Sequence, residues 1–268
     1  KAMFQGMRWL WSAAVKMNLI RGVDLLKAQG ENHLRSVSFE VGGHRHELST
    51  SLLLVHDGVI PNTWLSMSAG IKHHFNEIQD CWVPQIQGAG LTSRDCISIV
   101  GDAASIGGAE VAMLQGERVA REVDAYLEDH QRSETLIESW VLRRQRWMRS
   151  FIDEAFPSTA QFQLPENDIV VCRCEEVTAG EIRTVTERGC MGPNQGKAFT
   201  RCGMGPCMGR KCGLTVSRLM AQVRGVSVQE VGHYRIRSPI RPITVGQLAD
   251  MESSLNGDNQ SLLSADSS

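Results

Sequence analysis

The 268-residue chain lacks a strong excess of charge and any long apolar run. Its 28 basic and 30 acidic side chains leave a formal net charge of -2, which gives no support to nucleic-acid binding. No apolar segment reaches the roughly 18 residues needed to cross a bilayer, and no internal repeat is visible. With 42% hydrophobic and 22% charged residues, the composition is typical of a globular protein of about two domains.

The apolar start of the sequence is expected to be a packed helix and not a secretory leader. Arg8 and Lys16 interrupt the apolar start, and no small-residue cleavage site follows it. Clustered cysteines without such a leader indicate a reducing compartment, by default the cytoplasm, with a peripheral position at the inner membrane left open. Because the chain begins at Lys1 and its first apolar elements resemble the middle of a fold, we expect an N-terminally truncated fragment.

Four cysteines carry the strongest chemical signal. They form two close pairs, Cys172-x-Cys174 and Cys207-x4-Cys212. Two thiolates one residue apart can face a common ion, and the second pair completes a four-thiolate shell. Such a shell suits an iron–sulfur cluster or zinc. Structural disulfides are the third and weakest interpretation.

The surroundings of the second pair favour the cluster over zinc, without excluding zinc. Glycines in the run GMGPCMGRKC let the backbone approach the sulfur atoms closely. Positive charge near the pair would balance a negatively charged centre. The basic residues are Lys197, Arg201, Arg210 and Lys211.

Cys202 is an alternative to Cys212, because it stands as far before Cys207 as Cys212 stands after it. We prefer Cys212, since it opens the apolar run GLTVSRLMAQV, where a helix N-terminus would stabilise a thiolate. The other cysteines lie outside the proposed shell. Cys81 and Cys96 are expected to be buried thiols.

The first half of the chain has the pattern of an α/β protein. Three short segments between residues 23 and 50 predict successive strands, with Gly42-Gly43 as the turn between the last two. The following run, SLLLVHDGVIPN at residues 51–62, predicts a strand buried on both faces, as in an α/β sheet.

A strand, a small-residue turn and a helix follow one another between residues 96 and 128. The helix N-terminus would present free N–H groups to an anionic group, and Asp102 could accept from a sugar hydroxyl. This order predicts a phosphate or ribityl site. An ordinary turn in which Asp102 caps the helix is equally compatible with the sequence.

These segments together resemble the closing half of a flavoprotein with two dinucleotide-binding domains, of the pyridine nucleotide disulfide oxidoreductase type. The cysteine segment resembles the bacterioferritin-associated-ferredoxin-like [2Fe-2S] domain. The combination is similar to the FAD/iron–sulfur subunits of opine oxidases, hydrogen cyanide synthase and dye-linked L-proline dehydrogenase.

The resemblance implies an α/β fold: the C-terminal part of a two-dinucleotide-binding-domain flavoprotein, followed by a small helical [2Fe-2S] domain. It implies FAD contacts at Gly101, Asp102, Gly108 and Ala109. It also implies cluster ligation by Cys172, Cys174, Cys207 and Cys212. A related glycerol-3-phosphate dehydrogenase module has a similar glycine-rich pair with x4 spacing, and this resemblance supports Cys212 over Cys202.

Domain boundaries follow from the same resemblance. Residues 1–50 would be the remnant of an NAD(P)-like domain, and residues 51–128 the C-terminal half of the FAD-binding domain. Residues 129–165 would form a helical linker. The [2Fe-2S]-binding domain would occupy residues 166–235, and residues 236–268 would be a largely disordered tail.

The implied function is an electron-transferring subunit of an oxidoreductase that oxidises an amine or amino-acid-like substrate, of the opine, glycine or proline type. A second flavoprotein subunit would oxidise the substrate, so no catalytic residue is assigned here. Alternatives are an NAD(P)H-dependent reductase that passes electrons to the cluster and a non-catalytic metal-binding module. The Gly-x-Gly-x-x-Gly motif for the FAD ADP group is absent, and use of NAD(P) stays open.

Overall fold

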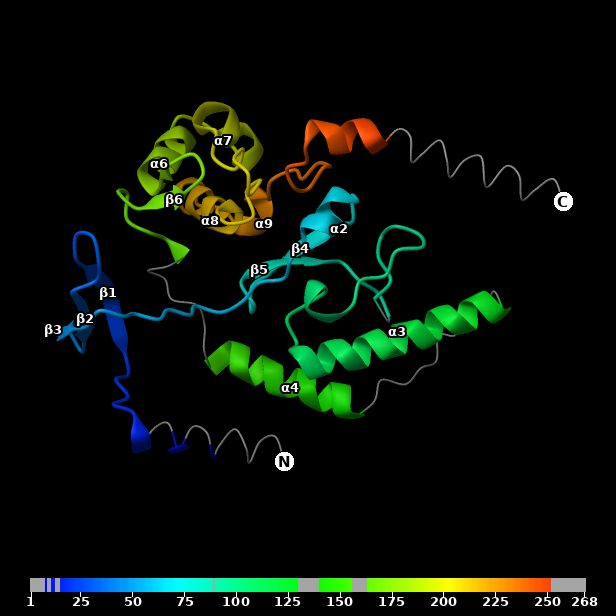
Figure 1. Ribbon diagram of the computed structural model, residues 1–268, viewed down its shortest axis with the longest axis horizontal. Helices are drawn as coiled ribbons and strands as arrows, with labels where there is room; N and C mark the ends of the chain where they lie inside the picture. The colour runs from blue at the N-terminus through cyan, green and yellow to red at the C-terminus, as the bar shows by residue number, and fades with distance from the viewer. Residues whose placement is uncertain are drawn as a thin grey trace. The chain divides into compact units, whose positions relative to one another are not determined.

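The computed structural model describes residues 8, 11–12, 15–88, 90–129, 140–155 and 163–251 (Figure 1). The chain divides into two compact units, Lys1–Asp57 and Gly58–Ser268. Among the described residues, no helix has the length and apolar character needed to cross a membrane.

The first unit contains the predicted meander of three strands. Strands β1 (Val23–Gln29), β2 (Ser36–Val41) and β3 (His44–Ser49) form an antiparallel sheet in that order. The β2–β3 turn consists of Gly42 and Gly43, with φ of 55° and 79°. Two successive positive φ angles are what a tight two-residue hairpin requires, and glycine adopts them without strain. This prediction is confirmed.

The segment at residues 51–62 is extended but forms no strand, so the prediction of a buried strand there is wrong. Its apolar side chains are solvent-exposed: Leu52 by 69%, Leu54 by 84% and Val55 by 66%. A strand buried on both faces needs hydrogen-bonded neighbours on both sides. None of the described strands pairs with these residues.

The second unit begins with a short helix and a hairpin. Helix α2 spans Trp64–Ser68, and strands β4 (His73–Asn76) and β5 (Cys81–Pro84) pair in antiparallel register. The predicted strand at residues 96–100 is wrong as well, because this segment makes only an isolated bridge between Leu91 and Ser98.

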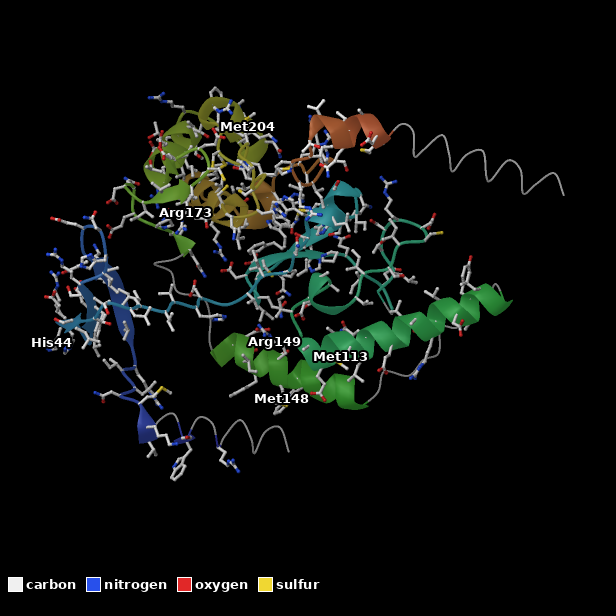
Figure 2. All side chains as sticks on the ribbon, in the orientation of Figure 1. His44, Met113, Met148, Arg149, Arg173 and Met204 are labelled. Atoms are coloured by element: carbon white, nitrogen blue, oxygen red, sulfur yellow. The ribbon has the colours of Figure 1, made fainter. Side chains whose placement is uncertain are left out.

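Two longer helices follow the predicted turn. A 3₁₀ turn, η1 (Gly101–Ala103), leads into α3 (Ala109–Asp129), as the sequence predicted for the helix. Helix α4 (Trp140–Ala155) lies in the predicted linker and contacts α3. Figure 2 shows Met113 on α3 and Met148 on α4 among side chains that project from the two helices, and Met113 is 67% exposed.

Residues 166–235, here called the cysteine module, are mainly helical, as predicted. Strands β6 (Val170–Cys172) and β7 (Val177–Thr178) form a small antiparallel pair. The helices are α6 (Ala179–Glu187), α7 (Pro193–Thr200), α8 (Gly213–Arg224) and α9 (Val228–Val231).

Local sequence signals define the ends of these helices. At the start of α6, the Thr178 side chain accepts from the backbone N–H of Glu181, whose own side chain accepts from the backbone N–H of Thr178. This reciprocal cap satisfies two N–H groups that the helix leaves free. Helix α8 begins after Cys212 at its N-cap and ends at Gly225, which has a left-handed backbone.

The module and the preceding hairpin share one hydrophobic core. Ile182, Val216 and Leu219 are at most 1% exposed, and the core also includes Phe75 and Trp82 from the hairpin. Burying each such side chain stabilises the fold by about 1.5–3 kcal/mol. The module is therefore supported by residues far before it in the sequence.

Polar contacts reinforce this packing. The Trp64 indole N–H donates to the Met208 carbonyl at 3.3 Å, and the Arg218 guanidinium forms an ion pair with Asp80. The chain after the module contains further helical residues at 245–251, preceded by a Thr244 side chain that accepts from the Gln247 N–H. Residues 252–268, predicted to be disordered, lie outside the described residues.

Candidate functional site

Five cysteine side chains of the module lie close together in space. Strand β6 positions Cys172, and the turn after it carries Cys174. The loop between α7 and α8 carries Cys202 and Cys207, and Cys212 caps α8. They form an inner group of three and an outer pair.

The inner group is Cys172, Cys202 and Cys212. Their sulfur atoms all lie within 4.8 Å of one another, and each residue is at most 2% exposed. The Sγ atoms of Cys202 and Cys212 are 4.0 Å apart. Their hydrogen bond lowers the pKa of Cys202 to about 7, against the opposing effect of burial. The same contact, together with burial, raises the pKa of Cys212.

The outer pair is Cys174, which is exposed, and Cys207, which is partly buried. Each of these thiols shifts the pKa of the other. Burial acts to raise the pKa of Cys207, but hydrogen bonds from the Lys211 backbone and the Cys174 side chain outweigh it and lower that pKa. A backbone hydrogen bond from Cys207 acts to lower the pKa of Cys174, but the Cys207 side chain, with smaller contributions, raises it overall.

The remaining cysteines lie outside these two groups. Cys190 is buried and donates to the Gly192 carbonyl. Cys81 is buried, as predicted, and burial raises the pKa of its thiol to about 12. The prediction for Cys96 is wrong, because its side chain is exposed on the coil before η1.

The glycine-rich loop approaches the cysteines as closely as the sequence suggested. A methyl group at Gly205 would lie 2.2 Å from Cβ of Cys174 and 3.2 Å from its sulfur. Contacts that short do not occur between real side chains, so only glycine fits there. The loop backbone therefore packs directly on the strand turn that carries Cys174.

Tyr234 is a functional residue that sequence reasoning missed. Its hydroxyl donates to the Cys202 carbonyl at 2.9 Å, and the residue is 4% exposed. Side chains at Gly203 and Gly209 would lie 2.5 and 2.7 Å from its ring. Tyr234 thus fills a space that the loop glycines leave, and it holds the Cys202 backbone in place. The spacing of the cysteines gives no signal for it, because it lies beyond α9.

Basic side chains surround the site, as predicted. Arg201 forms an ion pair with Glu175 at 2.9 Å, and the Arg210 guanidinium donates to the Cys207 carbonyl. The Lys197 ammonium lies 5.7 Å from the centre of the Tyr234 ring, and burial lowers its pKa from the ordinary value. Exposed ion pairs add little stability, and the Glu175 carboxylate offsets the charge of Arg201.

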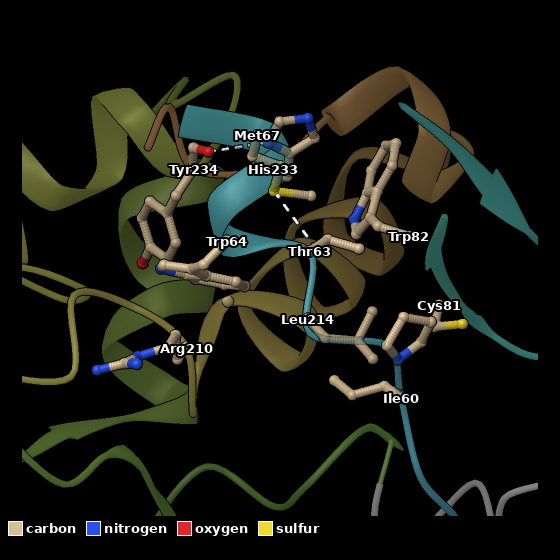
Figure 3. A pocket seen from close by; sticks show the side chains of 12 residues that line it. Ile60, Thr63, Trp64, Met67, Cys81, Trp82, Arg210, Leu214, His233 and Tyr234 are labelled. Atoms are coloured by element: carbon tan, nitrogen blue, oxygen red, sulfur yellow. Dashed lines mark hydrogen bonds between the residues drawn. The ribbon is translucent and has the colours of Figure 1, made fainter. Parts of the chain in front are cut away.

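A small apolar pocket adjoins the module (Figure 3). Its lining includes Trp64, Trp82, Leu214 and Tyr234, and its volume is about 30 Å³. Organic cofactors occupy sites of about 300–1,000 Å³. This pocket therefore has room for a water molecule and not for a flavin ring.

The residues predicted to contact FAD do meet at one turn. The Gly107 and Gly108 N–H groups donate to Oδ1 of Asp102 at 3.0 and 3.1 Å, and α3 begins at Ala109. The Gly101 N–H donates to the Gln115 side chain. Asp102 thus organises the turn through Oδ1, while Oδ2 makes no hydrogen bond to any described residue. The geometry is compatible both with a ribityl contact through Oδ2 and with a purely structural turn.

The cysteines fit an iron–sulfur centre by their chemistry. A [2Fe-2S] centre needs four thiolate ligands, and the described chain offers five in one module. Three of them have sulfur atoms within 4.8 Å of one another, and the other two influence each other's pKa. The four predicted ligands include both members of the outer pair. They also include two members of the inner group, Cys172 and Cys212.

Known proteins resemble this chain over most of its length. Residues 168–251 match the family described as the sarcosine oxidase A3 domain. An opine oxidase subunit of Rhizobium meliloti (strain 1021) is 37% identical over 257 residues, which cover 93% of this chain and 55% of that protein. Hydrogen cyanide synthase subunit HcnB of Pseudomonas aeruginosa is 35% identical over 209 residues, covering 73% of this chain and 43% of that protein.

A solved structure also resembles the chain. The crystal structure of L-proline dehydrogenase from P. horikoshii matches with a TM-score of 0.61 and 19% identity, over 92% of this chain and 48% of that one. At this identity the likeness shows the fold, and it confirms the predicted α/β class. The chain spans about half the length of the curated relatives it matches.

Proposed function

The chain is a homologue of HcnB and of the opine oxidase subunit, as the cysteine and βα-turn motifs predicted, and on this premise we propose that it belongs to a flavin-dependent oxidoreductase. Its substrate would be an amine or an amino-acid-like compound, of the opine, glycine or proline type. The chain's part would be electron transfer, with a second flavoprotein subunit oxidising the substrate. Both curated relatives are named as subunits, which supports a protein in which separate subunits oxidise the substrate and transfer the electrons.

The observation that carries the proposal is the grouping of five thiols within the cysteine module. Cys174 and Cys207 would hold one side of a [2Fe-2S] centre, and Cys172 and Cys212 the other. When bound, such a centre exchanges electrons singly, whereas a flavin exchanges them in pairs. The basic residues around the loop would offset the negative charge of the four thiolates.

The two thiol pairs differ in access to solvent. Cys172 and Cys212 are at most 2% exposed, whereas Cys174 is exposed. The buried pair lies against the core that the module shares with the preceding hairpin. The exposed edge is therefore the side from which an external electron acceptor would reach the centre.

The turn before α3 would supply the FAD contacts. Asp102 would accept from a ribityl hydroxyl through Oδ2, and the N-terminus of α3, at Gly108 and Ala109, would face anionic or hydroxyl groups of the cofactor. A side chain at Gly108 would have nothing within 4 Å, which leaves room for such a group beside the turn. We keep the predicted division at residues 51–128 for the FAD-binding part and 166–235 for the cluster domain. We also propose a cytoplasmic location, because clustered reduced thiols indicate a reducing compartment.

The test is anaerobic reconstitution of the 268-residue chain with iron and sulfide, read by metal and acid-labile sulfide analysis and by electron paramagnetic resonance. We expect about two iron and two sulfide per chain and a signal on reduction. Cys174→Ser should abolish the centre, whereas Cys190→Ser, at a buried thiol outside both groups, should retain it. A metal-free, reduced chain that takes up no sulfide on reconstitution would overturn the proposal.

A further inference from the structure

The module contains one more clustered thiol than a [2Fe-2S] centre uses. Cys202 is 2% exposed and lies 4.0 Å, sulfur to sulfur, from Cys212. Burying a thiol against two others, rather than against apolar groups, is not needed for packing, because a small apolar residue would fill the same space. The four-ligand centre therefore does not explain why a third thiol, Cys202, is buried in the inner group.

The spacing of the inner group suits one metal ion. Zinc lies about 2.3 Å from each thiolate in tetrahedral sites, so two sulfurs that share the ion are about 3.8 Å apart. The three sulfur atoms of Cys172, Cys202 and Cys212 lie within 4.8 Å of one another. Shifts of a few tenths of an ångström at each side chain would bring all three onto one ion.

The backbone around Cys202 is fixed in the orientation that directs this thiol inward. The Tyr234 hydroxyl holds the Cys202 carbonyl, and the Thr200 side chain accepts from the Cys202 N–H at 3.2 Å. Cys212 is held by the first turn of α8. Two of the three donors are thus positioned before any metal binds, which lowers the ordering cost of binding.

We propose that Cys172, Cys202 and Cys212 form a single-ion site for a soft or borderline divalent cation such as Zn²⁺. Three thiolates in a buried site select such ions over Mg²⁺ or Ca²⁺, and the thiols release their protons to solvent as the ion binds. The site shares Cys172 and Cys212 with the four-ligand centre. The two are mutually exclusive, so each chain holds either one ion or a cluster. This site does not depend on the proposed function.

Cobalt titration of the metal-free, reduced 268-residue chain tests the proposal, because bound Co²⁺ reports thiolate ligation through its charge-transfer and ligand-field absorption. The wild type should bind one Co²⁺ with these bands. Cys202→Ser and Cys202→Ala should each weaken binding more than about 100-fold, since loss of even an indirect partner of a metal ligand costs 10–100-fold. Cys174→Ser and the control Cys190→Ser should bind like the wild type.

Iron–sulfide reconstitution of the same variants should give the opposite pattern. Cys202→Ser should keep the cluster, and Cys174→Ser should lose it. Wild-type Co²⁺ affinity in a folded Cys202 variant, or a loss in Cys174→Ser equal to that in Cys202→Ser, would overturn the single-ion site. The two proposals can fail separately. If neither the wild type nor any variant takes up sulfide, but Co²⁺ binding still depends on Cys202 and not on Cys174, the electron-transfer proposal fails and the single-ion site stands.

Discussion

Leu219 and Leu54 illustrate how differently two regions of the chain are built. Leu219, on α8 of the cysteine module, is completely buried, whereas Leu54, in the coil of residues 51–62, is 84% exposed. Both lie in apolar sequence runs. The difference is that α8 makes its own hydrogen bonds and needs only a surface to pack on, whereas a strand needs other strands. A helix can thus form from its own sequence and then pack on a surface supplied from elsewhere, here partly by Phe75 and Trp82.

The largest test of this comparison makes the same substitution in both regions. Leu219→Ala should lower the free energy of unfolding by about 2–5 kcal/mol, because it leaves a cavity in a closed core. Leu54→Ala should change it by no more than about 0.5 kcal/mol. Urea unfolding followed by circular dichroism measures both. Equal losses would show that residues 51–62 are packed as tightly as the module.

A second pair of substitutions compares the loop of the module with a helix outside it. Gly205→Ala should destabilise the chain by about 1–3 kcal/mol, because its methyl group would overlap Cys174. Gly116→Ala, within α3 and with open space around it, should stabilise by about 0.5–1 kcal/mol. Thermal melting gives the sign of each. A neutral Gly205→Ala would mean that the loop does not rest on Cys174.

The chain's two tyrosines allow a third comparison. Tyr234→Phe keeps the ring between the loop glycines but removes the hydroxyl that donates to the Cys202 carbonyl, which should cost about 1–3 kcal/mol. Tyr126→Phe, on α3 and 40% exposed, should cost less than Tyr234→Phe, because solvent can replace interactions of an exposed hydroxyl. Urea unfolding measures both variants. If Tyr234→Phe also leaves stability unchanged, the Cys202 carbonyl has found another donor.

The smallest expected effect concerns the cap of α6. Thr178→Ala should cost about 1 kcal/mol, because it removes the side chain that accepts from the Glu181 N–H. Hydrogen bonds from the backbone and side chain of Thr178 lower the pKa of Glu181 below its ordinary value of 4.5. This contribution is present above pH 4.5 and is lost as the pH falls through the lowered pKa. Thr178→Ala keeps the backbone hydrogen bond and loses only the one from the side chain. The difference in stability between variant and wild type, measured by melting at several pH values, should therefore narrow only slightly in acid.

The sequence predicted best those features that depend on neighbouring residues. Gly42-Gly43 predicted the turn of the β2–β3 hairpin, and the apolar run after Cys212 predicted helix α8. The runs at residues 51–62 and 96–100 were predicted as strands from their apolar content alone, but strand formation depends on partners elsewhere in the chain. The pattern of apolar residues shows which face of a strand could be buried, but it does not show which other strand would pair with it.

The candidate site was predictable to a similar extent. The x and x4 spacings placed the four proposed ligands in one module, where Cys172 and Cys212 belong to the inner group and Cys174 and Cys207 form the outer pair. That these four bind one centre stays a prediction. The glycines predicted the close backbone approach at Gly205. Neither pattern predicted that Cys202 would be buried beside Cys212, because this depends on how the loop folds back across the module. Nor did they predict Tyr234, which reaches the site from beyond α9 through the tertiary fold.

The central claim is that the module is a single-electron carrier, and a reductive titration tests it most directly. The reconstituted 268-residue chain, free of flavin, would be titrated anaerobically with dithionite while visible absorption is followed. The account predicts uptake of about one electron per chain, with uptake abolished in Cys174→Ser and retained in Cys190→Ser. A reconstituted wild-type chain that takes up no electrons would contradict it.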